Sequence, residues 1–272
     1  MLRPALIPAP GKHFVVADWS AIEGRVNPWL AASAAGEAKL DVFRRKLDPY
    51  KVNAAATYGV QYLEVTGEQR QVGKVQELAL GFAGGVGAFA AMGRAYGVHF
   101  EESQARRVVD AWRRANPWAM PFWQDLEEAY TRAMRNPGHE FSAGRVTYLF
   151  DGQHLWYALP SGRVLCYPYA RLESDGVTYA KASWKPAADA KEWPRARLWK
   201  GLACENITQA TANDILRHAL RQCDDVVLHV HDEIVVETDK PIDLERIMCS
   251  PPAWAEGLPL AAEVQTMTRY GK

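Results

Sequence analysis

Two aspartates follow apolar segments of the chain in a way that could create a metal site. Asp18 ends residues 13–18, which are typical of a short buried strand, and Asp232 lies between the apolar segments 226–230 and 233–237. If these strands pack side by side, the two carboxylates come together, and Mg²⁺ prefers such oxygen ligands. A pair of ions about 3.5–4 Å apart supports in-line phosphoryl transfer. Aspartates at strand ends are also common turn residues, so the turn interpretation stays open for each.

A second candidate is a cationic and aromatic helical face. Arg70, Lys74, Leu78 and Phe82 recur at every fourth residue, so a helix would place them along one side. Two cations one turn apart repel each other unless an acid offsets them, and they suit an anion such as a triphosphate. Phe82 would offer a stacking surface to a base. An ordinary amphipathic helix with solvated cations explains the same spacing, and no GxxxxGK[ST] phosphate loop occurs.

The elements that must position these residues are mostly helical in the first half of the chain. After the first strand, Ser20 can cap a helix with Glu23 in capping-box spacing, although Pro28 predicts an irregular turn. The helical segments that follow are residues 49–58, 68 to about 96, 101–115 and 117–135, and glycines from Gly81 onward predict a flexible end to the second of them.

The second half changes character. Residues 145–150, 154–159 and 163–167 alternate between apolar and polar side chains and are separated by turn signals, which predicts a meander of hairpins. Residues 173–195 are compatible with another hairpin or with a loop. A helix over 206–222 precedes a tight hairpin that carries His231 and Asp232 at its tip. Glu233, the next residue, is either a further acidic metal contact or a solvated strand residue.

Composition bounds the class of protein. The 272 residues are 48% hydrophobic and carry 32 basic and 32 acidic side chains, so the chain can bury a large core and any basic surface must be local. Its four cysteines are widely spaced, which favours neither a disulfide framework nor a zinc cluster and fits a reducing cytoplasm. No run of eighteen apolar residues occurs, so we expect a soluble cytoplasmic protein without membrane partners.

Taken together, these segments resemble the three motifs of family A, the DNA polymerase I-like DNA polymerases. Residues 18–26, DWSAIEGRV, are similar to motif A, usually DYSQIELRV; residues 70–82 are similar to motif B; and residues 230–233, VHDE, are similar to motif C. Supporting matches are residues 48–50 and residues 205–214, which include Gln209. Residues 159–163 and 251–254 are similar to phage and prophage members, a resemblance that implies a bacterial or phage-infected host cell.

The resemblance implies an α+β fold: a palm with an antiparallel sheet and flanking helices, and a helical fingers subdomain. The palm would comprise residues 1–43, with motif A, and 141–272, with the hairpins and motif C, and the fingers residues 44–140. Family members usually have several hundred residues before motif A, whereas seventeen residues precede Asp18 here, so thumb and exonuclease are expected to be absent. Weak binding to DNA and low processivity would follow.

The implied activity is DNA-templated transfer of a deoxynucleotide from a dNTP to a primer 3′-hydroxyl. Asp18, Asp232 and the backbone carbonyl of Trp19 would bind two Mg²⁺ ions, with Mn²⁺ as a substitute, and Glu233 is a further candidate ligand. Lys74, which the resemblance assigns to catalysis with Asp18 and Asp232, and Arg70, assigned to substrate binding, would bind the β- and γ-phosphates as charge develops in the transition state. The remaining residues that the resemblance assigns are Glu23, Tyr50, Leu78 and Phe82 for the nucleotide, and Gln209, His231 and Arg25 for DNA.

Departures from the family pattern leave alternatives open. Ala21 replaces the usual glutamine, Leu78 stands where the family has phenylalanine or tyrosine, and Phe82 stands where it has tyrosine, so sugar discrimination is not settled by the motifs, although Glu23 favours deoxynucleotides. The alternatives are a non-catalytic DNA-binding remnant, one half of a split polymerase whose partner chain supplies thumb and exonuclease, and an enzyme that uses ribonucleotides or an RNA template.

Overall fold

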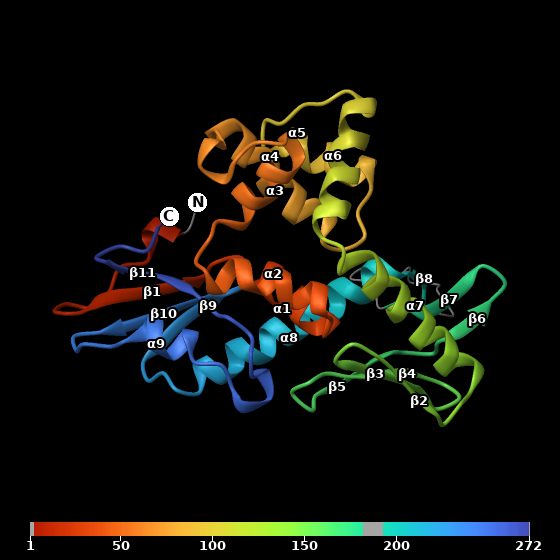
Figure 1. Ribbon diagram of the computed structural model, residues 1–272. Helices are drawn as coiled ribbons and strands as arrows, with labels where there is room; N and C mark the ends of the chain where they lie inside the picture. Colours follow the sequence, from red (N-terminus) through yellow and green to blue (C-terminus); the bar gives the residue numbers. More distant parts are fainter. Residues whose placement is uncertain (1–2, 182–192, 272) are drawn as a thin grey trace. The chain divides into compact units, whose positions relative to one another are not determined.

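The computed structural model describes residues 3–181 and 193–271 and has the expected α+β class, with helices and antiparallel sheets (Figure 1). The chain forms two compact units. Unit 1 comprises residues 1–26 and 209–272, and unit 2 comprises residues 27–208. No helix in the described part of the chain combines the length and the apolar character needed to span a bilayer.

Unit 1 is built on a four-stranded antiparallel sheet in the order β11-β1-β10-β9. Its strands are β1 (His13–Trp19), β9 (Val226–Val230), β10 (Glu233–Thr238) and β11 (Ala262–Met267). Four successive residues of β1, Phe14 to Ala17, are buried, because both faces of this central strand are covered. Strand β1 therefore lies between β10 and β11, which come from the other end of the sequence.

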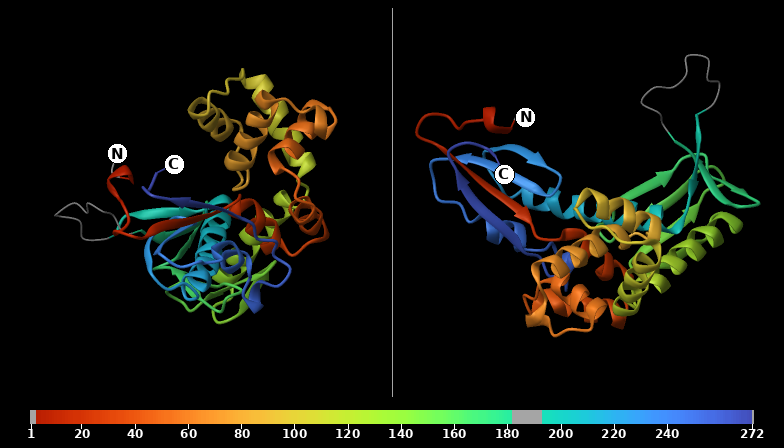
Figure 2. Two further views of the ribbon diagram at one scale, coloured as in Figure 1. Left: turned by 90° about the vertical axis from the view of Figure 1, so that its left-hand side faces the viewer. Right: turned by 90° about the horizontal axis from the view of Figure 1, so that it is seen from above.

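The two faces of this sheet are packed differently. On one face, Phe14, Val16, Val235 and Tyr270 form a buried cluster. On the other, the indole of Trp19 donates to the carbonyl of Met248 in α9 (Leu244–Cys249) at 3.0 Å. The segments near the two termini lie side by side, as both views of Figure 2 show. The backbone N–H of Tyr270 donates to the carbonyl of Leu6 at 3.0 Å and joins the two segments.

The first part of unit 2 is helical. Its helices are α2 (Ala34–Arg44), α3 (Pro49–Tyr58), α4 (Gly67–Leu80), α5 (Val86–Ala95), α6 (Glu102–Ala115) and α7 (Ala119–Arg135). Asp48 caps α3, since its carboxylate accepts from two backbone N–H groups, and Thr66 and Gln69 form a capping box at the start of α4. Helices α3 and α4 approach very closely at Gly73, where an added Cβ would stand 2.0 Å from the carbonyl oxygen of Tyr50.

Three sequence-based expectations about helices need correction. The helix predicted from 68 to about 96 is two helices, because Ala83 takes a left-handed φ of 58° and Gly84 packs against the carbonyl of Ala79, which breaks the path between α4 and α5. Helix α1 (Ile22–Ala31) begins after Ala21, whose φ is 52°, so Ser20 does not immediately precede it, and Pro28 lies inside it.

The third concerns α8 (Lys200–Leu220), which begins six residues earlier than the predicted start at 206 and ends two residues earlier than its predicted end at 222. Helix α2 is not among the predicted elements, because its run of small and charged residues gives a weak pattern. The short 3-10 turns lie at Arg3–Ala5, Tyr62–Glu64 and Ala253–Ala255.

The second part of unit 2 contains two sheets. The predicted meander is confirmed as β3 (Val146–Phe150), β4 (Leu155–Ala158) and β5 (Val164–Tyr167), which β2 (Glu140–Ala143) extends at one edge. Residues 173–195, for which the sequence allows a hairpin or a loop, contribute to a second sheet. Its three strands are β6 (Arg171–Glu173), β7 (Gly176–Ala180) and β8 (Arg195–Leu198), and residues 182–192 lie outside the described part.

Candidate carboxylate site and cationic helix

The carboxylate site of unit 1 lies where β1 ends and the β9–β10 hairpin turns. Asp18 stands opposite Glu233 in the antiparallel register, and the backbone N–H of Trp19 donates to the carbonyl of Asp232 at 3.4 Å. His231 adopts a φ of 58°, which closes the tight turn that the sequence predicts. Adjacent strands therefore bring Asp18 and Asp232, which are more than two hundred residues apart, to one end of the sheet.

The two aspartates interact electrostatically. Burial raises the pKa of Asp232, the hydrogen bond with His231 opposes that rise, and the negative charge of Asp18 adds to it. The pKa of His231 is raised chiefly by its hydrogen bond with Asp232, in which Nδ1 lies 2.9 Å from Oδ1, and further by the charges of Asp232, Glu23 and Asp18. The site thus concentrates negative charge that a cation would neutralise.

The donor set bears on which cation would fit. Among residues 3–181 and 193–271, no three His, Cys, Asp or Glu side chains are grouped so as to hold an ion by themselves. Magnesium is often bound by one or two carboxylates together with waters and substrate phosphates, so a pair of aspartates is compatible with this ion in a substrate complex. The two half-buried carboxylates fit that arrangement better than a closed, all-protein metal cage.

Glu233 is buried in the interior of unit 1. Its side chain is 3% exposed, and its carboxylate accepts a hydrogen bond from the hydroxyl of Tyr270. The interpretation of Glu233 as a solvated strand residue is therefore wrong, because the C-terminal segment covers it. Its assignment as a metal contact remains a prediction.

Three further predicted residues meet near the hairpin tip. The side-chain amide of Gln209 donates to Glu23 Oε1 at 3.2 Å, and Nε2 of His231 lies 4.0 Å from the same oxygen. Glu23 therefore connects α1 with α8 and with the turn that carries Asp232. Since these contacts lie within unit 1, the orientation of the Glu23 carboxylate is set there.

Arg25 is buried against the backbone of unit 1, and its assignment as a DNA contact remains a prediction. It is 6% exposed, and its guanidinium donates to the backbone carbonyls of Ser20, at 2.7 Å, and Pro259, at 3.0 Å. The side chain ties the segment after β1 to the segment before β11.

The cationic helix of unit 2 is α4. Arg70 forms an ion pair with Asp48, in which Nε lies 2.5 Å from Oδ2, and its guanidinium lies over the ring of Tyr50 at 5.2 Å. Lys74 Nζ lies 5.2 Å from the ring centre of Tyr96. The repulsion expected between the two cations is thus partly offset at Arg70 by Asp48.

The other two residues of the predicted face separate. Leu78 continues the face within α4 and is partly buried, whereas α4 ends at Leu80, so Phe82 lies in the turn beyond the helix. The expectation that all four side chains share one helical face is wrong for Phe82, because the break before α5 begins at Gly81.

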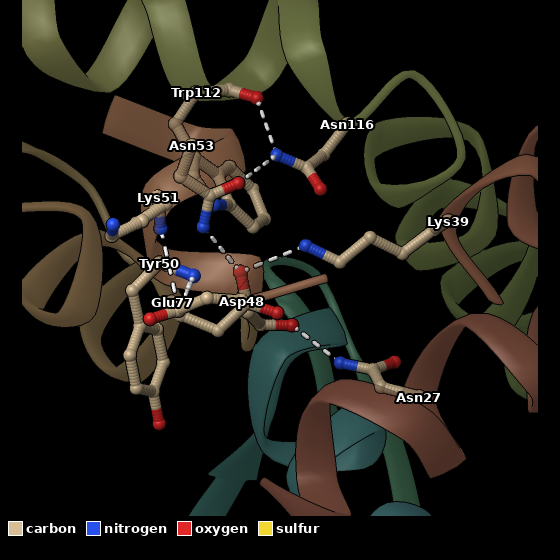
Figure 3. A network of polar contacts seen from close by, with 10 residues as sticks. Asn27, Lys39, Asp48, Tyr50, Lys51, Asn53, Glu77, Trp112 and Asn116 are labelled. Atoms are coloured by element: carbon tan, nitrogen blue, oxygen red, sulfur yellow. Dashed lines mark hydrogen bonds and ion pairs between the residues drawn. The ribbon is translucent and has the colours of Figure 1, made fainter. Parts of the chain in front are cut away.

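Beside α4 lies a buried polar network, shown in Figure 3, that the sequence does not predict. Lys39 of α2 lies 3.0 Å from Glu77 Oε2, and Asn53 of α3 donates to the same oxygen at 2.6 Å. The spacing of Glu77 three residues after Lys74 was visible in the sequence, but nothing local links Glu77 to a lysine thirty-eight residues earlier.

Comparisons with known proteins agree with the motifs. The profile of the family described as "DNA polymerase family A" matches residues 1–248. The chain is similar to a DNA polymerase of Bacillus phage SP02, at 38% identity over 283 aligned residues that cover all of this chain and 43% of the phage protein. It is also similar to DNA polymerase I of Pseudomonas aeruginosa, at 26% identity over 91% of this chain and 23% of that protein.

The fold also has a solved counterpart. The structure described as the POL domain of Pol1 from M. smegmatis in complex with DNA primer-template and dNTP superposes with a TM-score of 0.63, at 18% identity, over 98% of this chain and 41% of that one. The chain spans less than half the length of each of these relatives. With the family profile matched over most of its residues, the chain belongs to DNA polymerase family A.

Proposed function

We propose that this chain carries out DNA-templated DNA synthesis, joining a dNTP to a primer 3′-hydroxyl at the Asp18–Asp232 site. The supporting observation is that, in a member of this family, Asp18 at the end of β1 and Asp232 in the adjoining β9–β10 turn lie at one end of the unit 1 sheet, where the charge of Asp18 adds to the effect of burial in raising the pKa of Asp232. Bound Mg²⁺ would lower the pKa of the attacking hydroxyl and stabilise the leaving oxygen. Asp18, Asp232 and the Trp19 carbonyl would hold it, and Mn²⁺ would substitute.

Unit 2 would bind the nucleotide phosphates. Lys74 and Arg70 are the proposed ligands, because ammonium and guanidinium groups bind phosphate oxygens through charge-assisted hydrogen bonds. Asp48 holds Arg70 at its Nε edge and Tyr50 lies under its plane, so the guanidinium is oriented before any ligand arrives. Leu78, and Phe82 beyond the helix end, are the proposed contacts to the base or sugar.

Sugar selection would depend on Glu23. In the proposed role its side chain occupies the space that a 2′-hydroxyl needs, which favours deoxynucleotides. Gln209 and His231 would assist by fixing the Glu23 carboxylate, which each approaches in unit 1. Primer-template DNA is the proposed macromolecular partner, and a separate chain that supplies thumb and exonuclease is a further one.

Primer extension tests this proposal. With a labelled primer-template, dNTPs and Mg²⁺, the wild type should extend the primer, and Asp232→Asn should reduce the rate by about a thousandfold, equivalent to about 4 kcal/mol of transition-state stabilisation. Asp239→Asn, an exposed change in unit 1, is the matched control and should retain the wild-type rate. Extension that is indifferent to Asp232 would reject the site assignment. Absence of wild-type extension would leave the split-polymerase alternative, which addition of the missing chain would test.

A further inference from the structure

The buried polar network of unit 2 joins three helices at one carboxylate (Figure 3). Glu77 of α4 accepts from Lys39 Nζ at 3.0 Å and from Asn53 Nδ2 at 2.6 Å, both at Oε2. Asn116 extends the network, since its amide donates to Asn53 Oδ1 at 3.4 Å and to the carbonyl of Trp112 at 2.9 Å. The side chains of Lys39 and Glu77 are only 5% and 9% exposed.

Stability alone does not explain such a pair. Removing two charges from water costs several kcal/mol per ion, and well-packed apolar residues of similar volume are often as stable or more stable. Elsewhere on α2, the ion pairs of Arg44 with Glu37 and Asp41 lie at the surface, where this cost is small. The burial of Lys39 and Glu77 therefore points to a requirement of geometry or charge at α4.

Glu77 lies on α4 close to Lys74, the group that its carboxylate would affect if Lys39 and Asn53 did not hold it. Glu77 follows Lys74 by three residues, and oppositely charged side chains at this helical spacing attract each other. A Glu77 carboxylate turned toward Lys74 would neutralise the ammonium proposed to bind phosphate. Lys39 and Asn53 instead hold this carboxylate between α2 and α3.

We propose that Lys39 is a positioning residue that keeps Glu77 away from Lys74 and so preserves the positive charge of α4 for the nucleotide triphosphate. This inference rests on the proposed function of Lys74. Asn53 assists as the second donor, and the close approach of α3 and α4 at Gly73, one turn before Glu77, keeps Asn53 within reach.

The test separates charge from packing with matched variants. Lys39→Met removes the cation that holds Glu77 but keeps most of the side-chain volume, and it should raise the dNTP KM about tenfold with kcat nearly unchanged, as for loss of one phosphate ion pair. Lys39→Met combined with Glu77→Gln removes the competing carboxylate as well and should return KM to within about threefold of the wild type. Lys39→Arg, which keeps the positive charge, should have a dNTP KM close to that of the wild type. Arg44→Met, on the exposed side of α2, is the control and should leave KM unchanged.

Two results would overturn the inference. One is a folded Lys39→Met protein with the wild-type KM, and the other is a double variant as impaired as Lys39→Met, because the loss would then not come from the Glu77 charge. If Lys39→Met does not fold, Asn53→Ala removes the other donor to Glu77 and is judged by the same two outcomes.

Equilibrium dialysis with radiolabelled dATP separates this inference from the proposed function, because binding needs no chemistry. Wild-type binding that is weakened in Lys39→Met and restored in the double variant supports the inference even where primer extension fails and the proposed function falls. A wild-type chain that binds no dATP would overturn the inference, as would equal binding by wild type and Lys39→Met.

Discussion

Arg25 illustrates how a charged side chain can serve the backbone. Its position in a segment that resembles motif A suggests a contact to an anion, but the guanidinium is buried against the carbonyls of Ser20 and Pro259. The sequence could not reveal this, because backbone carbonyls carry no residue-specific signal and Pro259 is 234 positions away. The positions of Asp18 at the end of β1 and of Asp232 in the β9–β10 turn were predictable, since apolar runs adjoin both residues. Their role as metal ligands stays a prediction.

Replacing Arg25 by lysine should lower the free energy of unfolding by about 2–4 kcal/mol, because an ammonium lacks the planar fork that reaches both carbonyls and would be buried with fewer hydrogen bonds. Urea unfolding followed by circular dichroism measures this change. The control is Arg246→Lys in the same unit, where the arginine side chain is 76% exposed, and the expected change there is below about 0.5 kcal/mol. Equal effects of the two substitutions would contradict the bracing role.

At the scale of elements, segments with local signals were predicted well and segments held by distant contacts were not. Helix α3, with its Asp48 cap and N-terminal proline, has its predicted bounds, and the β9–β10 hairpin has its predicted tip. Strand β11 was missed because its residues are mostly exposed and its alternation is weak, so pairing with β1 defines it. The break after α4 was only partly predicted, because Ala83 has no sequence signature of a left-handed conformation.

The β3–β4 turn gives a prediction about pH. Asp151 accepts from the backbone N–H groups of Gln153 and His154 and from the indole of Trp156, each at 2.7 Å. The hydrogen bonds from His154 and Trp156 lead in lowering the pKa of this carboxyl from 3.8 to about 2. Because the folded pKa is depressed, its contribution to stability is present above pH 3.8 and is lost as the pH falls toward about 2.

Carboxyl carbon NMR would follow this group directly, and Asp151→Asn identifies its signal. The stability difference between wild type and Asp151→Asn should shrink as the pH is lowered through that window. A titration midpoint for Asp151 near the ordinary aspartate value would show that the turn does not hold the carboxylate as described.

At the scale of the whole molecule, unit 1 depends on both ends of the described chain. Strand β1 near the N-terminus pairs with β10 and β11 near the C-terminus, and Tyr270 reaches both the carbonyl of Leu6 and the carboxylate of Glu233. Such long-range pairing closes large loops and so forms late and slowly in folding. It is also invisible to any reading of local patterns, which is why the sheet order was not predicted.

Removal of residues 259–272 should therefore abolish a soluble unit 1. The truncation exposes the hydrogen-bonding edge of apolar β1 and leaves Glu233 without the Tyr270 donor, which favours aggregation. Size-exclusion chromatography and thermal unfolding would measure this. A truncation of residues 271–272 alone, which keeps β11 and Tyr270, is the control. Soluble monomer with an unchanged melting curve in the longer truncation would contradict the dependence on β11.

Gly73 has a consequence for sequence variation. With the Tyr50 carbonyl oxygen 2.0 Å from where a Cβ would stand, even alanine must push α3 away from α4. In a library randomised along α4 and selected for soluble, folded protein, position 73 should stay glycine while the exposed position 68 varies freely. Substitutions can thus accumulate on the exposed surface of α4, but the close spacing of α3 and α4 allows only glycine where the two helices cross.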